Sequence, residues 1–229
     1  EVHDSDGLLM QRGNGEWVWH PLAWSQQLQL NVFADDHPKG YGLLQRDRDF
    51  NHYQDLEAVY HKRPGVWVQP LWGFDKGAVR LIQLPTKDEF MDNVVAFWSP
   101  AEPPPPLQPV TIEYALRWIS DAADLSPLGR CISTRVDDQD KPYYRHFFLE
   151  FQGGPLDRLK PGEKPGLDIA SPTGAAITEA DVQWNDFNKS WRVSFYASTP
   201  ENKKPHELTC RLTSNGDPLT ETWSYTWMP

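Results

Sequence analysis

Carboxylates gather at three places in the first hundred residues of the chain. These are Asp4 and Asp6, then Asp47 and Asp49, and finally Asp88, Glu89 and Asp92. Cleavage of a glycosidic bond needs one protonated carboxyl for the leaving oxygen and one carboxylate that activates water or attacks carbon. Two such acids from distant positions can meet across a cleft, but acids in turns also cap backbone N–H groups. The spacing alone does not choose between these two roles.

Aromatic residues are unusually frequent around these acids. Eleven of the 229 residues are Trp. Sugars present C–H faces that pack on aromatic rings and hydroxyls that bond to carboxylates. The rings that are candidates for lining a sugar cleft are Trp17, Trp19, Tyr41, Tyr53, Tyr60, Trp67, Trp72 and Phe74. The composition is typical of a β-sandwich that handles carbohydrate, although several of these rings must belong to the core.

Motifs for other chemistries are missing from the sequence. The stretch His3-Asp4-Ser5-Asp6-Gly7 resembles half of a calcium loop, but the closing Glu and further oxygen ligands do not follow. There is no Gly-x-Ser-x-Gly elbow, Gly-rich phosphate loop or Cys-x-x-Cys pair. The two cysteines, Cys131 and Cys210, fit either one bridge or two buried thiols. We therefore expect no metal and no cofactor.

The charge and hydropathy of the chain exclude two classes of partner. The formal net charge is -10, and the acidic excess is spread over both halves without a basic stripe. Nucleic acids and anionic membrane surfaces attract clustered Lys and Arg, so neither is expected as a partner. The longest apolar runs, such as 94–98, are far too short to cross a bilayer. We do not expect an integral membrane protein.

Alternation of apolar and polar residues predicts an all-β protein. The expected strands are 16–20, 28–33, 41–45, 66–69, 78–84, 93–98, 110–118, 130–136, 145–151, 181–184, 191–196, 207–213 and 221–227. A short helix is expected at 53–60 and a single turn at 155–160. Frequent Pro and Gly leave no room for longer helices.

The four consecutive prolines at 103–106 predict a domain boundary. A polyproline stretch cannot join a sheet interior and forms a stiff spacer. We place a linker at 102–109 and, after it, a seven-stranded immunoglobulin-like β-sandwich at 110–229. Residues 1–101 carry most of the residues that could do chemistry, and they do not form a complete domain by themselves.

Several stretches together resemble a known family. They are 1–8 running into 15–19, then 40–50, then 63–68 leading to 84–98, and the closing 221–225. The chain resembles the C-terminal half of the osmoregulated periplasmic glucan biosynthesis proteins of types G and D (MdoG, OpgG and OpgD type). The resemblance implies that residues 1–101 are the C-terminal portion of a large antiparallel β-sandwich that binds glucan and carries the catalytic site.

The resemblance also implies roles for individual residues. Asp92 matches the general acid, and Asp4 matches a general base that acts through a relay of water. Glu89 and Tyr60 would order water and sugar hydroxyls beside them. The remaining supporting or substrate-binding candidates are Asp6, Trp19, Tyr41, Arg46 and Trp67. The arrangement suits an inverting mechanism, which needs room for water between base and sugar.

From the family we expect an enzyme that acts on β-1,2-glucan as an inverting-type glycoside hydrolase or transglycosylase. The alternative is a non-catalytic protein that binds glucan or assists its assembly. An adhesion module of immunoglobulin type would leave the first hundred residues unexplained. The family implies a periplasmic protein of Gram-negative bacteria, exported by a signal peptide that this chain does not contain. In the periplasm, Cys131 and Cys210 could pair. Its expected partners are glucan, the N-terminal half of its own protein and the membrane machinery of glucan synthesis.

Overall fold

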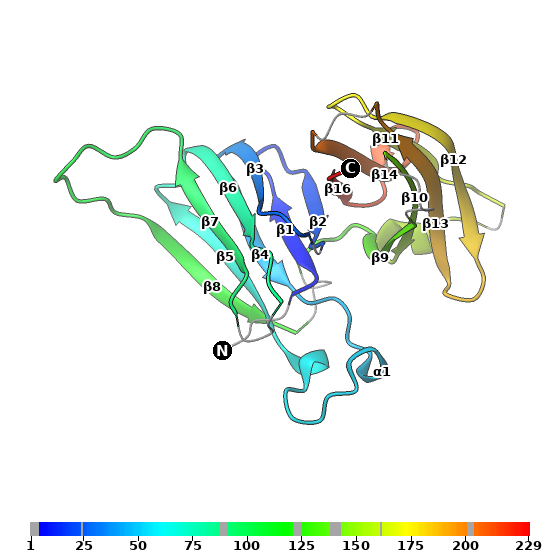
Figure 1. Ribbon diagram of the computed structural model, residues 1–229, viewed down its shortest axis with the longest axis horizontal. Helices are drawn as coiled ribbons and strands as arrows, with labels where there is room; N and C mark the ends of the chain where they lie inside the picture. Colours follow the sequence, from blue (N-terminus) through cyan, green and yellow to red (C-terminus); the bar gives the residue numbers. More distant parts are fainter. Residues whose placement is uncertain are drawn as a thin grey trace. The chain divides into compact units, whose positions relative to one another are not determined.

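The computed structural model describes residues 5–23, 25–87, 91–120, 125–137, 143–160, 162–200 and 204–229. The chain divides into two compact units, Glu1–Asp124 (unit 1) and Leu125–Pro229 (unit 2). Both units are built from antiparallel β-sheets (Figure 1). The prediction of an all-β sandwich protein is confirmed.

Unit 1 contains two sheets. Its elements are β1 (Gly7–Gln11), β2 (Trp17–Pro21), β3 (Gln29–Asp36), β4 (Gly40–Leu44), α1 (Phe50–Tyr53), the 3-10 turn η1 (Tyr60–Lys62), β5 (Gly65–Trp72), β6 (Lys76–Gln83), β7 (Val94–Pro100) and β8 (Glu113–Ile119). Strands β2-β1-β4-β5-β8 are hydrogen-bonded in that order, and β3-β6-β7 form a second, three-stranded sheet. The expected helix at 53–60 is replaced by α1 and η1, which lie at either end of that range.

The core of unit 1 lies between these sheets. Leu8, Met10 and Val18 pack with Val79 and Leu81, and all five are buried. Strand β1 was not predicted because three successive residues, 8–10, are all buried and the strand therefore shows no alternation. Strand β6 does alternate in its second half, and it was predicted.

The proline run does not separate two domains. It lies in the connection between β7 and β8, and β8 pairs along β5 from Gly65↔Ile119 to Trp72↔Glu113. The strand expected at 110–118 therefore belongs to unit 1, and the division of the chain falls after Asp124 instead of at 102–109. A stiff proline segment keeps out of any sheet, but it can equally well form a long loop within a domain.

Unit 2 contains seven strands of five residues or more among its described residues. Its elements are β9 (Arg130–Asp137), β10 (Tyr144–Gln152), η3 (Gly154–Arg158), β11 (Gly166–Ala170), β12 (Ala176–Asn185), β13 (Ser190–Ser198), β14 (His206–Ser214), β15 (Asp217–Pro218) and β16 (Thr222–Trp227). Strands β12-β13-β10-β9 form one sheet, and β11-β14-β16 lie side by side in another. The expected number of seven strands is present, with β11 in place of the strand at 110–118.

The core of unit 2 is closed and strongly apolar. Phe147, Phe195, Leu208 and Trp223 are fully buried. The rings of Phe147 and Phe195 are stacked at 5.0 Å. The structure has Cys131 and Cys210 as buried thiols without a disulfide, and burial raises the pKa of Cys210 well above its usual value. A reduced pair fits this core without any bridge.

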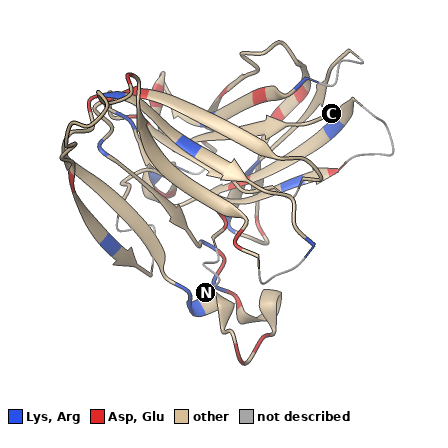
Figure 2. Ribbon diagram, turned by 60° about the vertical axis from the view of Figure 1, so that its left-hand side comes forward, with Lys and Arg blue, Asp and Glu red and all other residues tan. Residues whose placement is uncertain are grey.

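Charged residues of both signs are interspersed along the strands and loops (Figure 2). In unit 2 several of them form short ion pairs, such as Arg211 with Asp168 at 2.7 Å and Lys164 with Asp181 at 2.7 Å. These pairs offset individual carboxylates locally and leave the net charge of the chain unchanged. Within the described residues no helix has the length and apolar character needed to span a bilayer.

Candidate functional site

The candidate site lies at one end of unit 1, where a long segment connects β4 to β5. Gly7 at the start of β1 pairs with Pro21 at the end of β2 and with Leu44 at the end of β4. The chain then leaves β4, forms α1 and η1, and re-enters the sheet at Gly65 (Figure 1). We call residues 45–63 the 45–63 segment. It projects from the same end of unit 1 at which β1 begins.

Asp6 fastens the start of this segment. Its carboxylate oxygen Oδ2 accepts hydrogen bonds from the backbone N–H groups of Arg46 and Asp47, the latter at 2.6 Å. Burial raises the pKa of Asp6, while these two N–H donors oppose the rise. The described contacts make Asp6 an anchor of the 45–63 segment, and its expected role beside a substrate stays a prediction.

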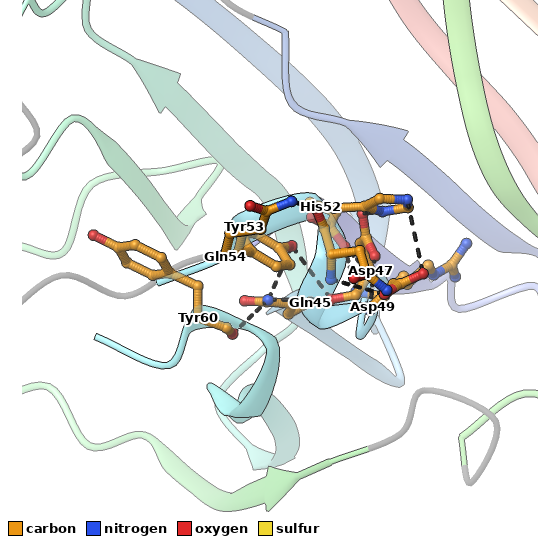
Figure 3. A network of polar contacts seen from close by, with 10 residues as sticks. Gln45, Asp47, Asp49, His52, Tyr53, Gln54 and Tyr60 are labelled. Carbon is orange, nitrogen blue, oxygen red and sulfur yellow. Dashed lines mark hydrogen bonds and ion pairs between the residues drawn. The ribbon is translucent and has the colours of Figure 1, made fainter. Parts of the chain in front are cut away.

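Gln45 ties the middle of the segment to its start. Its side chain is 2% exposed, and Nε2 lies 2.7 Å from the Tyr60 carbonyl, 3.1 Å from the Tyr53 hydroxyl and 3.2 Å from the Asp47 carbonyl (Figure 3). Arg48 contributes at the far end, where its guanidinium donates to the carbonyls of His61 and Arg63. Because these bonds close the segment on itself, it has a defined conformation without a core of its own.

A histidine and a carboxylate are paired on the surface of this segment. His52 Nδ1 lies 2.6 Å from Asp47 Oδ2, and both side chains reach solvent. Asp49 caps α1 by accepting from Asn51 N at 2.8 Å, which orients the turn that carries His52. The hydrogen bond that the His52 ring donates to the Asp47 carboxylate raises the pKa of His52. The sequence analysis did not propose His52, although the spacing Asp47-x-Asp49-x-x-His52 was a signal for a capped turn that returns a histidine to an aspartate.

Trp19 and Arg46 are brought together as a pair. The guanidinium carbon of Arg46 lies 3.5 Å from the centre of a Trp19 ring, a cation–π contact. Gly7 allows this packing, because a Cβ atom there would lie 2.5 Å from the indole. Trp19 is only 3% exposed. The arrangement covers the indole with the cation, so that Arg46 is the member of the pair nearer to solvent.

Two of the expected sugar-stacking rings belong to the core instead. Tyr41 is buried within the core cluster of unit 1. Trp67 is also buried and stacks on Trp17 at 5.7 Å between ring centres. Gly40 faces the Trp67 indole so closely that a Cβ atom would lie 2.0 Å away. These rings therefore belong to the core of unit 1 and do not present a face to a ligand.

Tyr60 lies at the rim of the 45–63 segment. Its ring is 6.0 Å from that of Tyr53, and the Arg63 guanidinium lies 5.6 Å from its centre. Figure 3 shows its phenol pointing away from the Asp47 and His52 pair. Tyr60 is half-buried, so part of its ring remains accessible. Its expected role in ordering water and sugar hydroxyls stays a prediction.

Asp92 is exposed and lies two residues before β7. Leu84 N donates to the Asn93 carbonyl at 2.7 Å, which closes the connection between β6 and β7. Gln83, next to Leu84, accepts from Ala23 N at 3.2 Å, and Leu22 N donates to the Asp6 carbonyl at 2.9 Å. This chain of contacts places Asp92 and Asp6 at the same end of unit 1. Asp4, Asp88 and Glu89 lie outside the described residues, and their roles remain predictions.

Comparison with known proteins shows the family. The model of the family described as "Periplasmic glucan biosynthesis protein, MdoG" matches residues 1–227. The chain is 41% identical over 236 residues to the "Probable glucans biosynthesis protein D" of Shewanella oneidensis and 40% identical over 238 residues to the "Glucans biosynthesis protein D" of Xanthomonas axonopodis pv. citri. Both alignments cover the whole chain and 44% of the relative, so the chain spans less than half of their length. The chain belongs to the periplasmic glucan biosynthesis protein family.

Proposed function

We propose that this chain carries the acid–base residues of a periplasmic enzyme that acts on β-1,2-glucan as an inverting-type glycoside hydrolase or transglycosylase. Membership of the glucan biosynthesis family supports glucan as the substrate class. The observation that carries the proposal is the convergence of Asp6, the 45–63 segment and the connection that holds Asp92 at one end of unit 1. Asp4, two residues before Asp6, is then expected at the same end.

The proposed reaction uses two aspartates in different states. Asp92 donates a proton to the glycosidic oxygen while the bond between that oxygen and the anomeric carbon breaks. Water attacks the anomeric carbon from the opposite side, and Asp4 receives its proton through a relay of water. In transfer, a sugar hydroxyl replaces the attacking water. Inverting enzymes hold the two carboxyl groups about 6.5–9.5 Å apart so that water fits between them.

The surroundings of Asp92 suit this role. Its side chain is exposed, so the leaving oxygen of a bound sugar can reach it. Tyr60 and Glu89 would order water and sugar hydroxyls, and Arg46, within the 45–63 segment, lies over Trp19. The internal hydrogen bonds of the 45–63 segment fix its conformation before substrate arrives, which lowers the cost of orienting the residues that it carries.

The whole protein is proposed to work in the periplasm and to comprise more than this chain. Large apolar side chains are exposed on the sheets of unit 1, including Leu30, Val95 and Trp118. The N-terminal half of the same protein is the proposed cover for these surfaces. The membrane machinery of glucan synthesis is a further proposed partner, since the family is one of glucan biosynthesis.

A non-catalytic role in binding or assembling glucan is the second candidate. The observation that favours it is the wording of the names of the relatives, which speak of biosynthesis and not of hydrolysis. In that case the aspartates would bond to sugar hydroxyls without transferring protons. The two candidates differ in whether the glucan backbone changes.

Incubation of the full-length protein with linear β-1,2-glucan distinguishes these functions. We expect shorter or rejoined chains from the wild type and a loss of at least about 100-fold in rate for Asp92→Asn, since proton transfer by a positioned group contributes roughly 10²–10⁴-fold. Asp36→Asn is the matched control, because Asp36 is exposed at the opposite end of β3. Equal rates for wild type and Asp92→Asn would exclude Asp92 as the acid. Binding of glucan without any product would establish the non-catalytic role.

A further inference from the structure

One face of the four-stranded sheet in unit 2 is open to solvent. Along β10, Phe147, Leu149 and Phe151 are fully buried in the core. At the alternate positions of the same strand, Tyr144, His146 and Phe148 are only half-buried, because successive side chains of a strand point to opposite faces. We call the solvent side of strands β9, β10, β12 and β13 the outer face.

A row of aromatic rings runs along this outer face. His146 is opposite Tyr196 in the register of β10 and β13, and their rings are stacked at 3.9 Å and 20°. Phe148 lies 4.0 Å from His146, and Tyr144 stacks on Tyr196 at 5.2 Å. These four rings make a continuous, partly exposed aromatic surface. The core of unit 2 is complete without them.

A hollow of about 270 Å³ adjoins this aromatic row. Its lining comes from three neighbouring strands and consists of Ser133, Arg135, Val136, Asp137, Phe148, Glu150 and Arg192. The register places Arg135 opposite Phe148 and Asp137 opposite His146. Hydrogen-bonding groups therefore stand directly beside the rings. The hollow is slightly below the range of roughly 300–1,000 Å³ that is typical of small-molecule sites.

The floor of this hollow is held in one conformation. Glu150 is 3% exposed and accepts from Arg192 Nε at 2.6 Å, from Asn185 Nδ2 at 3.1 Å and from the Ser190 hydroxyl. These bonds fix the Arg192 guanidinium, which still reaches solvent over about a third of its side chain. A ligand would find this polar group already ordered, so binding would not have to pay for arranging it.

We propose that the outer face of unit 2 is an auxiliary binding site for a neutral saccharide chain. The C–H faces of sugar rings would pack on His146, Tyr196 and Phe148, and the hydroxyls would bond to Arg135 and Arg192. The identity of the saccharide as β-1,2-glucan rests on the proposed function. The site itself belongs to unit 2 and uses none of the residues assigned to the reaction.

The charges and the topology favour a neutral glycan over other ligands. Two arginines, Arg135 and Arg192, stand against two carboxylates, Asp137 and Glu150, in the same hollow. The balance provides no net attraction for a polyanion. The rings lie on the two central strands, β10 and β13, so no free strand edge is offered there for pairing with a peptide. Half-exposed rings beside fixed polar groups are the arrangement that a sugar needs.

Hydroxyl-radical footprinting of full-length Asp92→Asn protein tests the site, since this variant is expected to leave the glucan intact. Linear β-1,2-glucan should reduce the labelling of Tyr144, His146, Phe148 and Tyr196. Phe187 is the internal control, because it is 98% exposed in the same unit and lies off the aromatic row. Unchanged labelling of the four rings at saturating glucan would overturn the proposal.

The same experiment separates this site from the proposed function. Tyr60 reports on the 45–63 segment, so protection of Tyr60 alone would overturn the auxiliary site and leave the reaction site in place. Protection of the outer face alone would support the auxiliary site and count against the proposed reaction site. Protection by heparin but not by neutral glucan would also overturn the proposal, because it would identify a polyanion as the ligand.

Substitution at the outer face supplies an independent readout. Tyr196→Ala in the Asp92→Asn background should weaken the glucan affinity of the unit 2 site about 5- to 10-fold, the effect of losing one aromatic contact. Arg135→Ala removes a hydrogen-bond donor without touching the rings and should act in the same direction. Phe187→Ala should bind like its parent. If both outer-face variants also bind like the parent, the outer face is not a saccharide site.

Discussion

The two units treat their apolar residues differently. In unit 2, Phe147, Phe195 and Trp223 are completely buried between its sheets, and the sheet surface that remains open carries rings and charges. In unit 1 a core is also present, but aliphatic residues continue onto the outside of the sheets. Leu30 and Val95 on β3 and β7 are each about half exposed. Both belong to one row across the sheet, because Leu30 pairs with Ile82 and Ile82 with Val95.

The difference indicates what each surface is for. A contiguous aliphatic face is costly in water and marks a surface that another part of a protein covers. A face of half-buried rings with balanced charges is stable in water and still able to bind sugar. The exposed aliphatic face of unit 1 thus resembles one half of a hydrophobic core, whereas the outer face of unit 2 needs no further protein to cover it. The relatives, in which the aligned region makes up 44% of the length, have further chain available for that cover.

The largest effect is expected in the closed core of unit 2. Trp223→Ala should lower the free energy of unfolding by about 3–5 kcal/mol, because it leaves a large cavity and removes ring contacts. Trp223 is fully buried, and its Nε1 donates to the Thr134 hydroxyl at 2.9 Å. Chemical denaturation followed by circular dichroism measures the change. Trp118→Ala is the control, since Trp118 is 66% exposed in unit 1 and should shift the midpoint little. Equal losses from both would contradict the contrast between the units.

A smaller and context-dependent effect is expected on the aliphatic face of unit 1. Leu30→Ala should change the stability of the 229-residue chain by no more than about 1 kcal/mol, as for most surface substitutions. In the full-length protein the same substitution should cost about 2–5 kcal/mol, because the side chain is then covered. Leu81→Ala is the matched control. Leu81 is fully buried in the same sheet, so its loss should be similar in both contexts. An equally small effect of Leu30→Ala in both would show that this face stays in water.

Much of the fold could be predicted from the sequence because most strands have one wet face. Strand β13, for example, alternates, and its predicted range of 191–196 lies within the observed strand. The strands that were missed follow other rules. β1 is buried on both faces, and β11 is a short strand in which Leu167 and Ile169 alternate with Gly166, Asp168 and Ala170. The proline run was correctly excluded from any sheet, but its sequence contains no information on whether the strands that it joins belong to one domain.

The site was predictable in its residue types but not in the contacts that those residues make. Asp6 was selected as an acid near the site, and the structure shows its carboxylate bonded to the backbone of Arg46 and Asp47. Tyr41 and Trp67 were predicted to contact sugar because of their residue type, yet both are buried. Burial depends on which face of a strand packs against the second sheet. That is a property of the tertiary structure, which a local pattern does not contain.

The smallest expected effect is the pH dependence of two surface ion pairs, one in each unit. In unit 2, hydrogen bonds from Lys164 and Gln183 lower the pKa of Asp181 to about 2. The ionised Asp181 carboxylate therefore stabilises the fold above pH 3.8, and this stabilisation is lost as the pH falls through about 2. In unit 1 the hydrogen bond that His52 donates to the Asp47 carboxylate raises the pKa of His52 above 6.5. The stabilisation by His52 is therefore complete below pH 6.5 and disappears as the pH rises through the folded-state pKa. Only the pair in unit 1 titrates near neutral pH.

NMR titration of the His52 ring measures this difference. We expect a pKa above 6.5 in the wild type and a return toward 6.5 in Asp47→Asn, because the hydrogen-bonded carboxylate is the main cause of the shift. Asp49→Asn is the matched control. It also removes a negative charge, but Asp49 lies 4.0 Å from His52 Nε2 and Asn retains the ability to cap α1. The control should therefore lower the pKa of His52 less than Asp47→Asn does. If the two substitutions lower it equally, the shift arises from the general negative field of the segment, and the paired geometry of Asp47 and His52 has no special role.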